Sequence, residues 1–407
     1  MKRIYLLGLM SLAAVTGVTA QEYLDTTSTN GNTEDVYVHL NTGEKARADR
    51  DNWDLGFENI GTTASVLING QKGVQLYATP FATSDWANFD TTGMSSWREY
   101  INSSESWSNG AFNQDLDLSN PFDLGWGTYN VQNHVITGDS VFLIMLADKS
   151  FKKIIINDLT AGTYTFTYAD VDGSNEKKKS VTKNDMKGQN FGYYSIVDEQ
   201  VVTREPATED WDLVFTEYII PIPTGPGMFQ NYPVSGVKIN KGIEVAQRDG
   251  VDVTSDDTMG LNWNTNISEI GSDWKSWDGT KYVYEQDRAY FVRLSGGSVW
   301  KIYFTQYAGG PAGTFYYTLE KIETGAGVNE LDMQSISIYP NPSAQLPIAI
   351  ALENNNELKA VIVYNNAMQM VHMQTDATVN TSNLQSGIYF LAVETTKGTA
   401  LKKLIIQ

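Results

Sequence analysis

Short apolar runs separated by turn-forming residues recur along most of the chain. Residues 35–40, 141–146, 162–168 and 289–294 are each rich in β-branched or aromatic side chains, and clusters of Gly, Asn and Asp lie between them. Runs of this length and composition are typical of β-strands. No long segment has the period of an amphipathic helix. The pattern therefore predicts an all-β, antiparallel fold.

The strand pattern is repeated once within the chain. Residues 51–57 and 209–215 share the sequence Trp-Asp-apolar-x-Phe at an offset of 158, and a similar strand precedes each, at 36–40 and 193–197. Further matches follow in the same order, and their offset falls only to about 150. The sequence therefore predicts two tandem copies of one β-rich module.

These matches give a domain division. We expect a first module at 21–172 and a second at 190–323, joined by a polar linker at 173–189. A second linker at 324–334 leads to a separate domain at 335–407. Polar segments between periodic ones are typical of exposed connections.

The first twenty residues have the composition of a signal peptide. Lys2 and Arg3 precede an apolar stretch at 4–15, and Val18-Thr19-Ala20 gives a small-residue cleavage site. The apolar stretch is shorter than the roughly 20 residues that span a bilayer. No later segment is apolar enough to span, so we expect an exported chain with no membrane-spanning segment after cleavage.

Charge and cysteine usage exclude several classes of function. Without residues 1–20 the chain has 27 basic and 48 acidic residues, a formal charge of −21, which argues against nucleic acid as a partner. The absence of cysteine excludes disulfides, thiolate metal sites, a cysteine nucleophile and a lipidated amino terminus. Any attachment to a surface must therefore use the other end of the chain.

The terminal segment 335–407 carries four ordered motifs: IYPNP at 338–342, VIVYN at 361–365, LQSGIYF at 384–390 and KKLIIQ at 402–407. In these motifs it resembles the carboxy-terminal sorting domain of the type IX secretion system. The resemblance implies a small β-sandwich that carries its cargo across the outer membrane of Gram-negative bacteria. It also implies the type IX machinery as a partner and an extracellular or outer-surface location.

Each repeat resembles the HmuY family of haem-binding proteins. The shared features are the Trp-Asp-apolar-x-Phe motif, a following Asn-Gly or Gly-rich turn, a Lys-Ile strand and a closing Gly-Thr-aromatic strand. They lie at 53–57, 68–70, 152–154 and 162–164 in the first copy and at 211–215, 225–227, 301–302 and 313–315 in the second. The resemblance implies that haem is held by axial His or Met side chains between loops at one end of a β fold.

Haem iron needs one or two such donors, and few are present. His39 and His134 both lie in the first copy. The loop residue His134 is the better candidate, because His39 sits on the opening strand, where an ordinary strand role is expected. A solvated loop position is the alternative for His134.

The second copy has no histidine, so haem there would need a methionine. Met228 lies in a proline-rich apolar loop and Met259 follows an acidic run, while Met94 could serve in the first copy. Packing is the alternative role for each of the three.

Other chemistry has weaker support. Residues 170–175 and 249–257 are rich in oxygen ligands but lack the distal Glu of a Ca²⁺ loop. No catalytic motif is present, so we do not expect an enzyme.

The sequence predicts a secreted or surface haem-binding protein. The alternative is a haem-independent module of the same fold that binds glycan or protein through the tryptophans of its middle segments, residues 86, 97, 107, 126, 263, 274 and 277.

Overall fold

The computed structural model describes residues 22–322 and 336–407, except 187, 256–257, 259, 353–356, 366–369 and 396–397. The described residues fall into two compact units, a large one within 22–322 and a small one within 336–407. The expected signal peptide and the expected linker at 324–334 lie outside the described residues. Strands dominate both units, and the described helices are short 3-10 turns, which confirms the all-β prediction.

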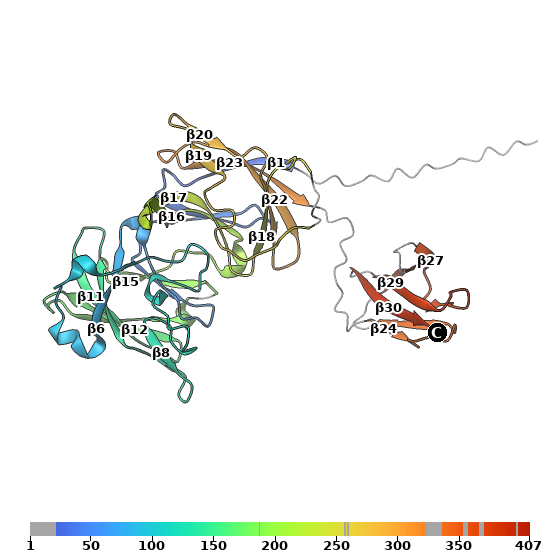
Figure 1. The fold of residues 1–407 in the computed structure, drawn as a ribbon, viewed down its shortest axis with the longest axis horizontal. Coiled ribbons are helices and arrows are strands. Elements are labelled where there is room, and N and C mark those ends of the chain that lie inside the picture. Colours follow the sequence, from blue (N-terminus) through green and yellow to red (C-terminus); the bar gives the residue numbers. More distant parts are fainter. Residues whose placement is uncertain are drawn as a thin grey trace, which may run out of the picture. The chain divides into compact units, whose positions relative to one another are not determined.

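The large unit contains two lobes, each with two main sheets (Figure 1). We call residues 51–205 the first lobe. Its larger sheet has the order β13-β12-β11-β10-β6-β7, with β8 and β9 attached to it, and its smaller sheet has the order β15-β14-β4-β5. The elements of the first lobe are β4 (Leu55–Glu58), β5 (Val66–Ile68), η1 (Gly70–Lys72), β6 (Gln75–Ala82), η2 (Thr83–Asn88), η3 (Met94–Ser96), β7 (Glu99–Tyr100), η4 (Ala111–Asn113), β8 (Gly127–Asn130), β9 (Val135–Gly138), β10 (Ser140–Met145), β11 (Phe151–Thr160), β12 (Thr163–Asp170), β13 (Lys177–Thr182), η5 (Lys183–Asp185), β14 (Phe191–Ser195) and β15 (Gln200–Val202).

The second lobe is built from two stretches of chain, residues 22–49 and 213–322. Its sheets have the orders β1-β23-β22-β21-β18 and β17-β16-β2-β3, and β19 and β20 form a separate hairpin. The elements are β1 (Glu22–Ser28), β2 (Glu34–Val38), β3 (Lys45–Asp49), β16 (Leu213–Gly225), β17 (Met228–Ile239), β18 (Glu244–Arg248), β19 (Lys275–Trp277), β20 (Tyr282–Tyr284), β21 (Ala289–Arg293), β22 (Val299–Tyr307) and β23 (Thr314–Ile322), with η6 (Thr208–Asp210) between the lobes.

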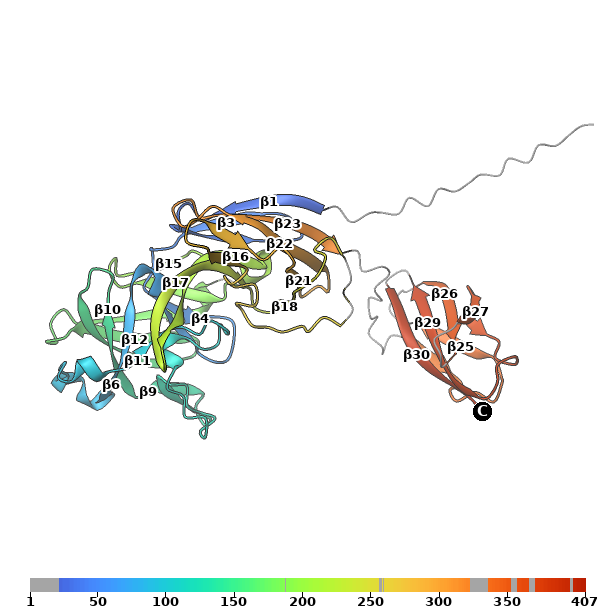
Figure 2. The ribbon, with the colours of Figure 1, turned by 45° about the horizontal axis from the view of Figure 1, so that its top comes forward.

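The opening strands of the two repeats are exchanged. Strand β2 of the first repeat pairs with β16 of the second, while β14 of the second repeat pairs with β4 of the first. Strand β1 likewise pairs with β23. In Figures 1 and 2, β1 is the blue strand that lies beside the orange strand β23. The expected division at 21–172 and 190–323 therefore does not follow the sheets. The physical reason is that similarity between two copies does not reveal which copy a strand pairs with.

The expected linker at 173–189 is also largely structured. Strand β13 lies at the edge of the larger first-lobe sheet and pairs with β12. Its three lysines, Lys177, Lys178 and Lys179, are half-buried or exposed. Charged side chains on an edge strand discourage pairing with another chain, so the polar composition reflects an edge position.

Each lobe has its own core, and the cores confirm the lobe boundaries. The first core draws only on residues between Leu55 and Ile196, whereas the second combines Val36, Val38 and Leu40 with residues between Leu213 and Leu319. Two smaller clusters lie where the lobes meet, and Trp107 packs against both of them. Trp107 thus connects the two lobes.

The small unit is a β-sandwich, as expected. One sheet has the order β24-β25-β28 and the other β27-β26-β29-β30, and a single core takes side chains from both. The strands are β24 (Ile336–Tyr339), β25 (Ile348–Leu352), β26 (Leu358–Tyr364), β27 (Met370–Gln374), β28 (Thr378–Val379), β29 (Gly387–Thr395) and β30 (Gly398–Ile406). Within the described residues of the chain, no helix has the length and apolar character needed to cross a membrane.

Candidate functional site

The Trp-Asp motifs hold the exchanged strands in place. Asp54 Oδ2 accepts the backbone N–H of Ile196 at 2.7 Å, and Asp212 Oδ2 accepts that of Leu40 at the same distance. The two aspartates therefore play equivalent roles, because each binds the backbone at the end of a strand from the other repeat. This reciprocal capping brings the two tryptophans of the motifs, Trp53 and Trp211, to the boundary between the lobes.

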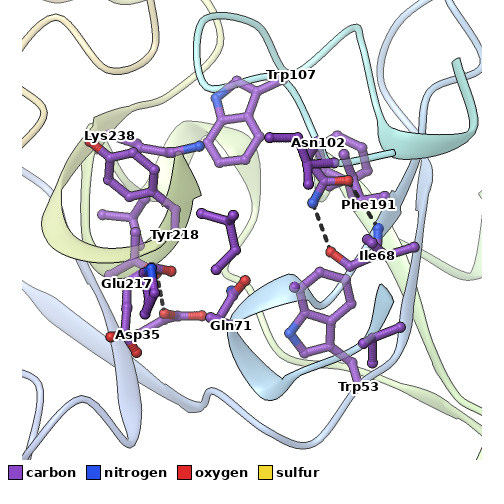
Figure 3. A pocket seen from close by; sticks show the side chains of 18 of the residues that line it. Asp35, Trp53, Ile68, Gln71, Asn102, Trp107, Phe191, Glu217, Tyr218 and Lys238 are labelled. Carbon is purple, nitrogen blue, oxygen red and sulfur yellow. Dashed lines mark hydrogen bonds between the residues drawn. The ribbon is translucent and has the colours of Figure 1, made fainter. Parts of the chain in front are cut away.

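A cavity of about 370 Å³ lies at this boundary (Figure 3). Its volume is within the range of roughly 300–1,000 Å³ that is usual for small-molecule sites. Side chains from both lobes line it, and aromatic rings form much of the wall. These aromatic residues are Tyr37, Trp53, Trp107, Phe191, Tyr193, Trp211 and Tyr218.

Two equivalent aromatic pairs fix the geometry of the wall. Tyr37 packs edge-on against Trp211 with ring centroids 5.1 Å apart, and Tyr193 packs edge-on against Trp53 at 4.9 Å. The Nε1 atoms of both tryptophans are buried and have no hydrogen-bond partner. Most buried indole N–H groups find an acceptor, so these two donors are unusual.

Arg204 links the lobes at the edge of this cavity. Its Nη2 donates to Asp35 Oδ2 at 2.5 Å and its Nη1 to the Tyr37 hydroxyl at 3.1 Å, while its guanidinium lies 5.0 Å from the Tyr193 ring centroid. The neighbouring Glu205 accepts the Phe191 N–H and the Tyr193 hydroxyl. Burial raises the pKa of Glu205 to about 7.

Lys238 is the most unusual group in the wall. It lies on β17, is only 6% exposed, and its Nζ is 4.4 Å from the Tyr218 ring centroid and 5.2 Å from that of Trp107. Figure 3 shows its amine end directed toward the Trp107 ring. Across the part of the chain that the structure describes, its Nζ has no hydrogen-bond acceptor and no carboxylate partner. Burial lowers the pKa of Lys238 to about 7.

This burial predicts a pH dependence of stability. Burial also lowers the pKa of Lys275 to about 7, so the folded chain binds fewer protons than the unfolded chain above neutral pH. We therefore expect the free energy of unfolding to rise with pH between about 7.5 and 9, by up to about 1.4 kcal/mol per pH unit for each lysine. Below about pH 7 these lysines are protonated in the folded chain as well, and the stability gained at higher pH is lost.

Urea denaturation at several pH values, followed by indole fluorescence, measures this slope. All ten tryptophans lie between Trp53 and Trp300, so the signal reports on the large unit alone. Lys238→Met is expected to remove one lysine's share of the slope, whereas Lys178→Met, on the exposed edge strand, is expected to leave the slope unchanged. A slope of zero in the unmodified chain would contradict the assignment.

The structure does not bring the predicted haem donors together, and none of the described ones lines this cavity. His134 is exposed in the β8–β9 turn, where its Nδ1 lies 2.7 Å from the Tyr129 hydroxyl. Met94 on η3 packs in an aromatic cluster on the first lobe, and Met228 is 59% exposed at the β16–β17 turn. Met259 lies outside the described residues.

His39 ends up near the second Trp-Asp motif. It follows β2, and its Nδ1 is 3.8 Å from Asp212 Oδ2. In the terminal domain, His372 is exposed on β27 and its Nε2 lies 3.0 Å from Gln374 Oε1. Neither histidine lines the cavity.

The sequence analysis did not identify Lys238, Arg204 or Asp35 as candidate site residues. The available signal was the repeated Trp-Asp motif, which marks the two tryptophans at the cavity. Lys238 stands between Val237 and Ile239, both fully buried, so the alternation along the strand predicts a solvent-facing lysine. The other lobe covers that face of the sheet instead.

Comparisons with known proteins add a family for the terminal domain. Residues 337–407 match the family described as "Secretion system C-terminal sorting domain". No curated protein matches the chain.

Two solved structures show weak similarity to the chain. "Apo PinO from Porphyromonas gingivitis" is 10% identical, with a TM-score of 0.24, over 75% of this chain and 99% of that one. The "BSP domain" of a "Biofilm associated protein" is 10% identical, with a TM-score of 0.15, over 98% of this chain and 83% of that one. TM-scores this low support no argument about the fold.

The match to the sorting domain agrees with the motifs at 338–342 and 384–390 and with the β-sandwich of the small unit. The prediction of a type IX sorting domain is therefore confirmed. Its partner is the type IX secretion machinery, and the chain is exported to the cell surface or the extracellular space.

Proposed function

We propose that residues 22–322 form an exported binding module that holds a small saccharide in the cavity between the lobes. The observation that carries this proposal is the wall itself, in which aromatic rings from both repeats line one cavity. Sugars offer flat C–H faces that stack on aromatic rings and hydroxyl groups that accept and donate hydrogen bonds. The cavity is too small for a folded protein partner.

Uncommitted amide groups support a saccharide further. Gln71 lines the cavity from η1 and Asn231 lines it from β17. Neither side chain has a hydrogen-bond partner among the residues that the structure covers. An amide supplies both donors and an acceptor, which matches the hydroxyl groups of a sugar. Asn102, by contrast, accepts the backbone N–H groups of Ile68 and Ala111 and donates to the Ile68 carbonyl.

Filling the cavity tests the proposal. Gln71→Trp places a large ring in the cavity without removing a protein contact, and it is expected to weaken saccharide binding at least tenfold. Gln132→Trp, on the exposed β8–β9 turn, is the matched control and is expected to bind as the unmodified chain does. Binding to an array of neutral and acidic oligosaccharides, followed by calorimetry on those that bind, gives the affinities. Equal binding by both variants, or no binding by the unmodified chain, would exclude the cavity as a saccharide site.

The second candidate function is haem binding, as the resemblance to the HmuY family implies. Met94 is the donor that this proposal puts first, because it is half-buried and packs in a cluster with the rings of Phe81, Trp86, Phe89 and Trp97. Thioether sulfur is an established axial ligand of haem iron, and aromatic side chains are suited to packing against the flat porphyrin.

A haemin titration of the chain distinguishes this candidate. Under the haem proposal, the unmodified chain gives a saturable shift of the Soret band, Met94→Ala weakens it, and His134→Ala leaves it unchanged because His134 is exposed to solvent. Loss of the band in His134→Ala would assign the ligand to that histidine instead. Spectra identical to those of free haemin would rule out haem and leave the saccharide proposal.

A further inference from the structure

Among the described residues the amine of Lys238 has no anionic partner, and an anion bound beside it would favour its charged ammonium form. A buried charge without a partner is costly, and native proteins nearly always pair such a group or bind it to a ligand. Lys238 is buried between the rings of Tyr218 and Trp107 and borders the cavity. The face of an aromatic ring compensates an ammonium only in part. The open side of Lys238 is therefore the cavity.

Among the residues that the structure describes, four carboxylates line the cavity, those of Asp35, Glu99, Glu205 and Glu217, and each has a partner other than Lys238. Glu99 accepts from Gln75 Nε2 at 2.9 Å. Asp35 accepts from Arg204 and from the Thr216 hydroxyl, both at 2.5 Å. Glu217 pairs with Arg50. Each carboxylate therefore has a closer partner than Lys238.

Glu205, the third buried acid of this wall, is also occupied. It accepts the Phe191 N–H at 2.7 Å and the Tyr193 hydroxyl at 2.8 Å. Its raised pKa means that it carries only part of a negative charge at neutral pH. The charge of Asp35 acts on Lys238, but no carboxylate among the described residues forms an ion pair with the amine.

The Lys238 ammonium can only donate hydrogen bonds. A carboxylate is an acceptor-only group with two oxygens. The two groups match in charge and in hydrogen-bonding role, so Lys238 favours a ligand with a carboxylate over a neutral one.

We propose that the saccharide held in this cavity is acidic, with a uronic-type carboxylate that pairs with the Lys238 ammonium. This inference rests on the saccharide proposal above and narrows it to one class of sugar. The aromatic rings hold the body of the sugar, and the Lys238 ammonium selects for its charge. Charged hydrogen bonds in a buried setting are the strong ones, so the carboxylate contributes much of the affinity.

The test compares one oligosaccharide in two forms. Calorimetry measures the affinity of the chain for an oligosaccharide containing uronic acid and for the same oligosaccharide after its carboxyl groups have been reduced to alcohols. We expect the acidic form to bind at least tenfold more tightly. Lys238→Met is expected to remove this preference and to keep the binding of the reduced form, which also shows that the variant is folded. Lys178→Met, at an exposed position on β13 that does not line the cavity, is expected to retain the preference.

The outcomes separate the two proposals. If the unmodified chain binds both forms equally, the cavity is a saccharide site and the acidic preference is wrong. If Lys238→Met keeps the full preference, a residue other than Lys238 binds the carboxylate. If the chain binds neither form, the inference fails together with the saccharide proposal. If a sulfated oligosaccharide binds more tightly than the uronic one, the anionic group that pairs with Lys238 is a sulfate ester and not a carboxylate.

Discussion

Replacing Asp54 by alanine will lower the free energy of unfolding of the large unit by about 3–5 kcal/mol. The Asp54 side chain is fully buried, pairs with Lys72 Nζ at 2.7 Å and accepts the N–H of Ile196. Alanine leaves the largely buried Lys72 ammonium with only the Trp53 carbonyl as an acceptor, at 3.4 Å, and leaves the Ile196 N–H without one. Removing one member of a buried ion pair typically costs this much. The loss is large because the aspartate joins two segments that are far apart in sequence.

Denaturation of the chain, followed by indole fluorescence, measures this change. Asp51→Ala is a suitable control, because Asp51 is 52% exposed in its side chain and pairs with Arg50 at the surface. Its expected cost is below about 1 kcal/mol. A cost for Asp54→Ala as small as that of Asp51→Ala would mean that the exchanged strand β14 does not depend on the motif.

A loss of similar size, about 3–5 kcal/mol, is expected for Arg204→Met. The side chains of Arg204 and Asp35 are 2% and 5% exposed, and they join the first lobe to the second. Methionine keeps most of the packing against Trp53 and Tyr193 but leaves the Asp35 carboxylate without its cation. The contact between the lobes should weaken, so we also expect the unfolding transition of the large unit to split into two.

Differential scanning calorimetry detects both effects. Arg47→Met serves as the control, since Arg47 is 45% exposed and pairs with Glu34 outside the cavity. It is expected to cost less than about 1 kcal/mol and to keep a single transition. A single transition with unchanged stability in Arg204→Met would show that the lobes are held together by other contacts, such as the ion pair of Lys241 with Glu58 at 2.7 Å.

The sequence predicted the fold class and the repeat because these depend on local patterns. Alternating strands and turn residues are visible without tertiary information, and the Trp-Asp motif occurs in both copies with the same role for Asp54 and Asp212. The motifs of the terminal domain were equally clear. Each of these features is carried by residues close together in the chain.

Pairing between distant strands could not be predicted in this way. Nothing in residues 34–38 shows that they pair with β16 instead of β4, because both partners have the same motif. The equivalence of tryptophans in the two copies is equally hidden. Trp126 is buried before the β8–β9 hairpin and Trp274 is buried before the β19–β20 hairpin, whereas the nearby Trp277 is 57% exposed.

The cavity was hidden for a related reason. In a strand whose residues alternate between buried and exposed, a lysine is expected to face solvent, and Lys238 occupies such a position. Only the placement of Trp107, from a loop of the other lobe, turns this face into a buried one; its Nε1 donates to Ile239 O at 2.9 Å. Histidine and methionine were considered for their chemistry, whereas the groups that lack partners are a lysine and two tryptophans.

The pairing of β1 with β23 also sets an order in which the chain can fold during export. The first lobe is one continuous stretch, so it can complete its sheets as soon as residues 51–205 are available. The second lobe cannot, because Thr27 meets Tyr317 across 290 residues of chain. Until the last strand emerges, residues 22–49 lack their partners, and unpaired strands are the ones most exposed to aggregation. The second lobe is therefore the part of the cargo most in need of protection before its carboxyl end has crossed the inner membrane.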